Sequence, residues 1–121
     1  MNKNILIIDD SESIRELVGA SLEEANFSVH KAINGQDGLD QLLGKDIHLI
    51  ITDLNMPVMD GLTFVKEVRK KSEYKFTPIL ILTTELEAKK RQEAKISGAT
   101  GWIVKPFDKE KLLKIINKII R

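Results

Sequence analysis

The stretch NILIIDDSES, residues 4 to 13, decides the fold, because four apolar residues lead directly into two neighbouring aspartates. The run Ile5 to Ile8 is typical of a strand that is buried on both faces, as in a parallel sheet. Asp9 and Asp10 instead favour water or a cation. The stretch therefore predicts a buried strand that ends at an acidic site. The plainer interpretation is a loop at a helix N-terminus, where carboxylates are also favoured.

Further apolar runs follow along the chain, separated by helix patterns. The runs lie at residues 27–33, 47–52, 78–84 and 101–104, and the helix patterns cover residues 13–25, 34–44, 61–71, 84–97 and the segment after Asp108. The run at 27–33 alternates with polar residues, which predicts an edge strand. This order of strand and helix, repeated five times, predicts an α/β fold with a parallel sheet and helices on both faces.

Several residues mark where the helices begin and end. Ser13 with Glu16, and Thr84 with Glu87, each have the spacing of a capping box at a helix N-terminus. Gly98 is expected to end the helix that Thr84 opens. Asp108 is expected to cap the last helix.

Length and composition exclude several classes of protein. A chain of 121 residues predicts one domain, over residues 1–121. With 42% hydrophobic and 31% charged residues, it is neither membrane-embedded nor disordered. The net charge of +1 does not favour binding to nucleic acid or to an anionic membrane. The absence of cysteine excludes disulfides and thiolate metal sites, and no long apolar segment suggests a leader or a membrane span, so a cytoplasmic location is expected.

Polar residues follow four of the five predicted strands. Asp9 and Asp10 follow the first, Asp53 closes the third, Thr83 ends the fourth, and Lys105 follows the fifth. Each of these residues alone has an ordinary explanation as a turn former, strand residue or surface charge. Because ligands bind at the carboxyl ends of the strands in open α/β sheets, their combination predicts one shared site.

The expected chemistry of this site is that of a metal and a phosphoryl group. Three clustered carboxylates repel one another unless a proton or cation compensates them. Oxygen ligands suit a hard ion such as Mg²⁺, which binds one or two carboxylates together with phosphate oxygens. A lysine and a threonine suit the phosphate, and one carboxylate is left as nucleophile.

Four segments, in order, resemble the receiver domain of two-component response regulators. They are LIIDDSES, ITDLNMPVMDG, ILILTTE and GATGWIVKPF. The resemblance covers the whole chain and is closest to stand-alone chemotaxis regulators of the CheY type. It implies a flavodoxin-like sheet with strand order 2-1-3-4-5 and five helices.

The resemblance also implies a role for each residue of the site. Asp53 would accept a phosphoryl group from phosphohistidine on a sensor histidine kinase of the CheA kind. Asp9 and Asp10, with Asp53 and the backbone carbonyl of Asn55, would hold Mg²⁺, for which Mn²⁺ is expected to substitute. Thr83 would donate a hydrogen bond to the phosphoryl group and Lys105 would pair with it. The Lys105–Pro106 bond is expected to be cis.

Two further features carry expectations from the family. Asn55 and Glu85 each lie two residues after a site residue and would tune the access of water, which predicts a short-lived phosphorylated form. Trp102 stands where the family usually has Tyr or Phe as its switch residue, three positions before the lysine. The alternative is that Trp102 is an ordinary half-buried aromatic.

The partner surface implied by the resemblance is the fourth helix, the last strand and the last helix. Lys89, Lys90, Trp102 and Lys109 are its candidate residues. The expected partners are the kinase, a downstream protein such as the flagellar motor switch, and a phosphatase. The protein is expected to be a monomer that uses neither nucleic acid nor a membrane.

Three alternatives stay open at this point. The chain could be a phosphorelay carrier, or a receiver excised from a larger regulator. An aspartyl-nucleophile phosphatase of the haloacid dehalogenase type would use similar residues, but it needs a second Asp where Asn55 stands. We therefore expect no enzymatic activity beyond transfer to, and loss from, the protein's own aspartate. A flavodoxin is disfavoured because DDSES would repel a flavin phosphate.

Overall fold

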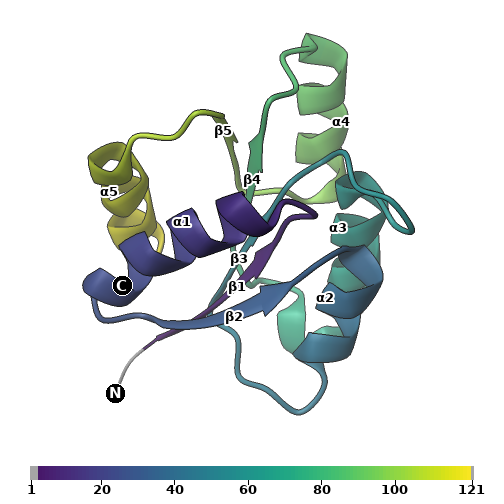
Figure 1. Ribbon diagram of the computed structural model, residues 1–121. Coiled ribbons are helices and arrows are strands. Elements are labelled where there is room, and N and C mark those ends of the chain that lie inside the picture. The colour runs from purple at the N-terminus through teal and green to yellow at the C-terminus, as the bar shows by residue number, and fades with distance from the viewer. Residues whose placement is uncertain (1–2, 121) are drawn as a thin grey trace.

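Five parallel strands form one sheet in the computed structural model, which describes residues 3–120. The strands are β1 (Asn4–Ile8), β2 (Ser28–Ala32), β3 (Leu49–Thr52), β4 (Ile79–Thr83) and β5 (Gly101–Val104). Their order in the sheet is β2-β1-β3-β4-β5, with every neighbouring pair parallel (Figure 1). The predicted fold class and strand order are thus confirmed, and the predicted edge strand β2 lies at one edge.

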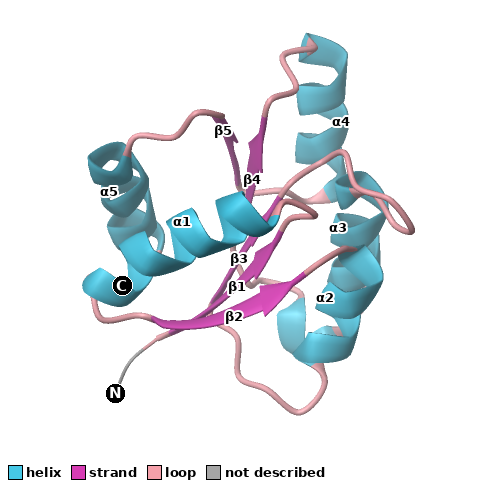
Figure 2. Cartoon of the chain, viewed as in Figure 1, coloured by secondary structure: helices cyan, strands magenta, loops and turns pink. Residues whose placement is uncertain are grey.

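Helices cover both faces of this sheet (Figure 2). They are α1 (Glu12–Glu24), α2 (Gly35–Leu42), α3 (Gly61–Arg69), α4 (Ala88–Ser97) and α5 (Lys109–Ile119), with a short 3₁₀ helix, η1, at Ser72–Tyr74. Side chains of α1 and α5 share one apolar core, and those of α2, α3 and α4 share the other. Among residues 3–120, no helix is both long enough and apolar enough to cross a membrane.

The apolar run of β1 supplies both of these cores. Ile5 and Ile7 pack with α1 and α5, whereas Leu6 and Ile8 pack against the α2 and α3 side. All four are at most 1% exposed. This alternation is the period of two that a strand imposes on its side chains, and it explains why all four residues are apolar. The central strand is therefore held rigidly from both sides where it delivers Asp9 to the carboxyl edge.

The first helix begins earlier than its predicted capping box. Ser11 is the N-cap of α1, and its Oγ accepts a hydrogen bond from the backbone N–H of Ile14 at 3.3 Å. Ser13 lies inside the first turn. Two serines spaced two residues apart compete for the cap, and the prediction chose the wrong one.

The predicted start of the fourth helix is also wrong. Residues 84–87 are not helical, and α4 begins only at Ala88, with Glu87 at the N-cap position and no side-chain cap. The reason lies at the end of β4, where the Oγ1 of Thr83 accepts a hydrogen bond from the backbone N–H of Glu85. That contact makes a turn after the strand and delays the helix. The other two predicted ends are confirmed, since Asp108 caps α5 and Gly98 ends α4.

Val58 has a backbone conformation that is unfavourable for its side chain. Its φ is +70° and the residue is 80% exposed in the loop between β3 and α3. A β-branched residue is strained in this left-handed region, whereas Asn tolerates it. Val58→Asn is expected to raise the free energy of unfolding by about 1 kcal/mol, measured by urea denaturation. Leu43→Asn is the control, because Leu43 is also exposed but has a φ of −66°; an equal gain there would contradict this explanation.

Candidate functional site

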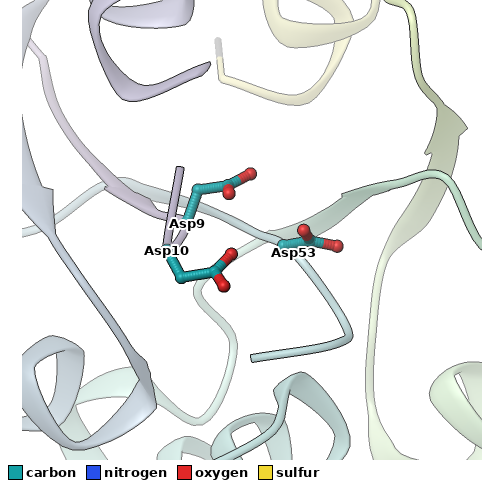
Figure 3. Close-up of side chains that lie close together, drawn as sticks. All are labelled: Asp9, Asp10 and Asp53. Atoms are coloured by element: carbon teal, nitrogen blue, oxygen red, sulfur yellow. The ribbon is translucent and has the colours of Figure 1, made fainter. Parts of the chain in front are cut away.

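Three carboxylates gather at the carboxyl edge of the sheet. Asp9 and Asp10 follow β1, Asp53 follows β3, and each offers an oxygen that lies within 4.8 Å of the others. Figure 3 shows the three side chains projecting to the same side of the strand ends. Asp9 is 2% exposed and Asp53 is 9% exposed, whereas Asp10 is open to solvent. The residues that the sequence placed at separate strand ends thus lie together.

Lys105 joins two of these carboxylates. Its Nζ donates to Oδ2 of Asp9 at 2.7 Å and to Oδ2 of Asp53 at 3.0 Å. The three side chains are 3–11% exposed, so this ion-paired group is largely shielded from water. Lys105 follows β5, and its bond to Pro106 is cis, as the family resemblance implies. The structure therefore places one cation between a carboxylate of β1 and a carboxylate of β3.

Burial by itself shifts the pKa of Asp9 and the pKa of Lys105 in opposite directions. Burial raises the pKa of Asp9, although hydrogen bonds from Lys105 and from the backbone N–H of Ser11 work against it. Burial by itself lowers the pKa of Lys105, but its hydrogen bonds and charge interactions with Asp9 and Asp53 outweigh that effect and raise it. The ammonium is thus well compensated, while the ionised Asp9 is not. A further cation near Asp9 would relieve this imbalance.

Asp53 is held from two directions by the loop that follows it. The backbone N–H of Leu54 donates to Oδ1 of Asp53 at 2.6 Å. On the other side, a Cβ added to Gly61 would collide with the carbonyl oxygen of Asp53. The start of α3 therefore packs directly on the backbone of Asp53. Only glycine permits that approach, which explains the glycine in the segment MPVMDG.

Arg15 is a neighbour of the site that was not predicted from the sequence. Its Nη1 donates to the backbone carbonyl of Asp9 at 2.6 Å, from α1. The backbone N–H of Ser11 donates to Oδ1 of the same residue at 3.0 Å. Together they fix the turn that carries both aspartates. The sequence signal that could have predicted this contact is the position of Arg15 in the first turns of the helix that follows the aspartates.

Thr83, Glu85 and Asn55 surround the carboxylates on the β3 and β4 side. Thr83 is fully buried at the end of β4, and its Oγ1 accepts the N–H of Glu85 at 3.2 Å. Glu85 is half-buried and Asn55 is exposed in the β3–α3 loop. Their predicted roles, the metal-binding carbonyl of Asn55 included, stay predictions.

The residues predicted for a partner surface do not all share one face. Trp102 is half-buried on β5 and lines a groove of about 500 Å³ between β5 and α4. The α4 side of this groove is formed by Arg91, Gln92 and Lys95. These three residues were not predicted from the sequence, although Arg91 and Lys95 have the i, i+4 spacing that places side chains on one face of a helix.

None of the three predicted lysines lines this groove. Lys89 is exposed and Lys90 is half-buried near the start of α4. Lys109 pairs with Glu24 at the end of α1, so its ammonium points toward α1. The predicted surface is therefore formed by α4 and β5, with Lys109 turned toward a different neighbour.

The residues at the carboxyl edge fit a magnesium ion. Asp9, Asp10 and Asp53 offer only oxygen atoms, which a hard divalent cation prefers over softer ligands. The raised pKa of Asp9 indicates a carboxylate that lacks sufficient positive charge around it. Because Asp10 is exposed, water can complete the coordination, as Mg²⁺ requires.

Removing the charge of Asp9 or of Asp10 should weaken metal binding without lowering the stability of the fold. Asp9→Asn and Asp10→Asn are each expected to weaken Mg²⁺ binding by at least about tenfold. Neither should lower the melting temperature without metal, because like-charge repulsion is relieved. At Asp9 the amide oxygen can still accept one of the two hydrogen bonds that Ser11 and Lys105 donate to separate carboxylate oxygens.

Calorimetric titration with Mg²⁺ and thermal melts with a chelator measure the two effects. The gain in stability of Asp9→Asn over the wild type should grow as the pH rises above 3.8, the ordinary pKa of the group, because its pKa in the fold is raised and ionisation there is unfavourable. A melting temperature that falls steeply in either variant would overturn this reasoning.

The chain is similar to proteins of known family. A family model described as the response regulator receiver domain matches residues 5–117. The transcriptional regulatory protein SrrA of Staphylococcus aureus is 36% identical over 121 residues, which are all of this chain and 49% of that protein. The chain thus spans about half the length of the curated relatives it matches.

Solved structures show the same arrangement. The chemotaxis protein CheY4 of Vibrio cholerae is 48% identical, with a TM-score of 0.94 over 98% of this chain and 99% of that one. The receiver domain of the sensor histidine kinase PA1611 of Pseudomonas aeruginosa has a TM-score of 0.91 at 22% identity, over 99% and 98% of the two chains. In that structure a magnesium ion is coordinated in the active site cleft. The last likeness concerns the fold alone.

Proposed function

This chain belongs to the response regulator receiver domain family of two-component systems, and from that premise we propose that it is a signalling switch controlled by phosphorylation of Asp53. The observation that carries the proposal is the position of Lys105, which contacts both Asp9 and Asp53 within the carboxylate cluster. A nucleophile, an acidic metal site and an anion-binding ammonium are the parts that phosphoryl transfer needs.

The proposed reaction uses a phosphohistidine of a sensor kinase as donor. An oxygen of the Asp53 carboxylate forms a bond to phosphorus while the bond from phosphorus to the imidazole nitrogen breaks, and the imidazole takes up a proton from water. Mg²⁺ held by Asp9, Asp10, Asp53 and the carbonyl of Asn55 would neutralise charge on the phosphoryl oxygens. The hydrogen bond from the N–H of Leu54 holds the other carboxylate oxygen and orients the attacking one.

The residues around Asp53 then receive the product. The Nζ of Lys105 exchanges one of its carboxylate contacts for a phosphoryl oxygen. The Thr83 hydroxyl would donate to the same group, because its oxygen now accepts from the N–H of Glu85 and its own hydrogen remains available. We propose that a movement of Thr83 toward the phosphoryl group is coupled to an inward turn of Trp102, which would change the surface of β5 and α4. Such a change of surface is the signal that a partner reads.

The phosphorylated form is expected to be short-lived. Asn55 is exposed and Glu85 is half-buried beside the site, so polar side chains there leave water within reach of the acyl phosphate. The check is the decay of the phosphorylated protein in Mg²⁺ buffer after the donor has been removed. Decay within minutes is the expected result, and a phosphoaspartate that persists for hours would contradict it.

Chemotaxis is the pathway best supported for this switch. The similarity to CheY4 extends over nearly the whole of both chains. We therefore propose a kinase of the CheA kind as donor and the flagellar motor switch as the downstream partner, with a phosphatase as a further partner. The protein would act as a cytoplasmic monomer without nucleic acid. The similarity to half of SrrA supports the alternative, in which the receiver belongs to a larger regulator.

Partner binding separates the switch from a phosphorelay carrier. The experiment is a pull-down with purified flagellar switch protein and purified histidine phosphotransfer protein, each with and without beryllofluoride and Mg²⁺. Binding of the switch protein that increases with beryllofluoride supports the proposal. Binding of the phosphotransfer protein that increases with beryllofluoride, without binding of the switch protein, would instead identify a carrier. Repeated turnover of p-nitrophenyl phosphate would identify an enzyme.

A further inference from the structure

Helix α4 is attached to the rest of the molecule mainly at one end. Of its residues, all of which the structure describes, only Ala94 is buried. Its first turn has no side-chain cap, and residues 86–89 are exposed. Figure 1 shows α4 projecting from the body of the molecule. A helix of this kind is stabilised by few apolar contacts, so polar contacts at its ends decide its position.

The side chain that contacts its C-terminal end from another helix is Arg69. This residue ends α3, and its Nε and Nη2 donate to the carbonyl oxygen of Gly98 at 3.1 and 2.8 Å. Its Nη1 donates to the carbonyl oxygens of Tyr74, Lys75 and Thr77 at 2.9, 3.3 and 2.7 Å. One planar guanidinium therefore joins α3, the segment before β4 and the end of α4. The ammonium of a lysine could not reproduce this fork of donors.

Gly98 is fitted to this contact from the other side. Its φ is +116°, in the left-handed region that favours glycine, and a Cβ there would lie 2.9 Å from Cγ of Arg69. Two residues later, the backbone N–H of Thr100 donates to the carbonyl of Ile79 at 2.7 Å. The chain is thus fixed at the point where α4 passes into β5. Burial lowers the pKa of Arg69, because its guanidinium is partly removed from water.

The groove that contains Trp102 lies directly beside this fixed point. It is about 500 Å³ in volume and is bounded by Arg91 and Lys95 of α4 on one side and by Gly101 and Trp102 of β5 on the other. Ala94 is the one buried residue of α4, so few apolar contacts hold this helix at a fixed angle. The distance between the α4 wall and the β5 wall of the groove therefore depends on the angle of the helix. That angle is controlled where the helix is fixed.

We propose that Arg69 is the positioning residue of α4: it fixes the C-terminal end of the helix as a pivot and so sets the width of the groove beside Trp102. The N-terminal end, which follows Thr83 through an uncapped segment, is left free to move. Movement of Thr83 at the end of β4 is therefore converted into a tilt of α4 rather than a displacement of the whole helix. This last step rests on the proposed function; the pivot itself does not.

The experiment compares Arg69→Gln and Arg69→Lys with Tyr74→Phe in the full chain. Tyr74 lies in the same region and its hydroxyl bonds to the carbonyl oxygens of Leu42 and Lys45, but neither of these contacts involves α4. Tyr74→Phe thus removes a buried polar contact of the same region without releasing the pivot. The measurements are amide hydrogen exchange along α4 and α5 and quenching of Trp102 fluorescence by acrylamide. Neither measurement requires phosphorylation.

We expect amides of α4 to exchange at least tenfold faster in both Arg69 variants than in Tyr74→Phe, while amides of α5 exchange alike. Quenching of Trp102 should rise at least twofold in the Arg69 variants only. Gly98→Ala, which crowds the same contact, should reproduce both effects if the Arg69 variants fold poorly. Equal exchange and equal quenching in the Arg69 and Tyr74 variants would show that Arg69 serves stability alone and would overturn the proposal.

Discussion

The substitution Asp53→Asn is expected to abolish phosphorylation of the protein. The amide is a poor nucleophile, and Asp53 is the carboxylate that we propose as the phosphoacceptor. Asp9 has a similar pair of contacts, from Lys105 and the backbone N–H of Ser11, but it is more deeply buried, at 2% exposed against 9% for Asp53. The rate of phosphoryl incorporation from acetyl phosphate should fall by at least about a thousandfold. Intact-mass spectrometry after incubation with Mg²⁺ and the donor measures the effect.

The variant itself should remain folded. The new asparagine side chain is nearly isosteric with the aspartate, and its one oxygen can still accept the hydrogen bond from the backbone N–H of Leu54. Asp46→Asn is the matched control, because Asp46 is an exposed carboxylate at the opposite edge of the sheet. It should be phosphorylated like the wild type. Modification of the Asp53→Asn protein at the rate of the control would show that another residue is the acceptor.

Removal of Lys105 is expected to have the largest effect on stability. Lys105→Met leaves Asp9 and Asp53 buried without their shared cation. Removing one partner of a buried ion pair lowers the free energy of unfolding by about 3 kcal/mol. Urea denaturation at neutral pH, with a chelator present, measures this loss. Because the pKa of Lys105 is raised in the fold, the wild type keeps this contribution below the ordinary pKa of 10.5 and loses it as the pH rises through the folded value.

The same variant should bind Mg²⁺ more tightly while it loses function. The Lys105 ammonium occupies carboxylate oxygens that a metal would use, so its removal ends a competition and should raise Mg²⁺ affinity about tenfold, which is about 1.4 kcal/mol. Mg²⁺ should also restore part of the lost stability. Lys114→Met, at an exposed position of α5, is the control. Unchanged stability and unchanged Mg²⁺ affinity in Lys105→Met would mean that the ion pair has no energetic role.

The fold followed from the sequence because its strongest signals are local and repeated. The run Ile5 to Ile8 and its later counterparts are apolar on both faces, which few structures other than a covered parallel sheet require. The site followed from the same pattern, since Asp9, Asp53 and Lys105 come directly after strands whose carboxyl ends share one edge. The strand order and the roles of individual residues could be predicted only from the family resemblance. Hydrophobic periodicity shows where strands lie in the sequence, but not which strands are neighbours in the sheet.

What the sequence did not predict depends on side chains that reach across the fold. The hydroxyl of Thr83 delays α4 to Ala88, although Thr84 and Glu87 have the spacing of a cap. Arg15 and Arg69 look like ordinary helix charges until the structure shows the carbonyl oxygens that they contact. These contacts follow no periodic pattern in the sequence, so they are seen only in the folded structure.

The fluorescence of Trp102 tests the central claim most directly, because it is the single tryptophan of the chain. Wild type and Asp53→Asn are titrated with Mg²⁺ and then with beryllofluoride, a stable mimic of the phosphoryl group. We predict a saturable change of fluorescence that requires Mg²⁺ in the wild type and is absent in Asp53→Asn. The same response in both proteins would contradict the assignment of Asp53 as the phosphorylated residue of the switch.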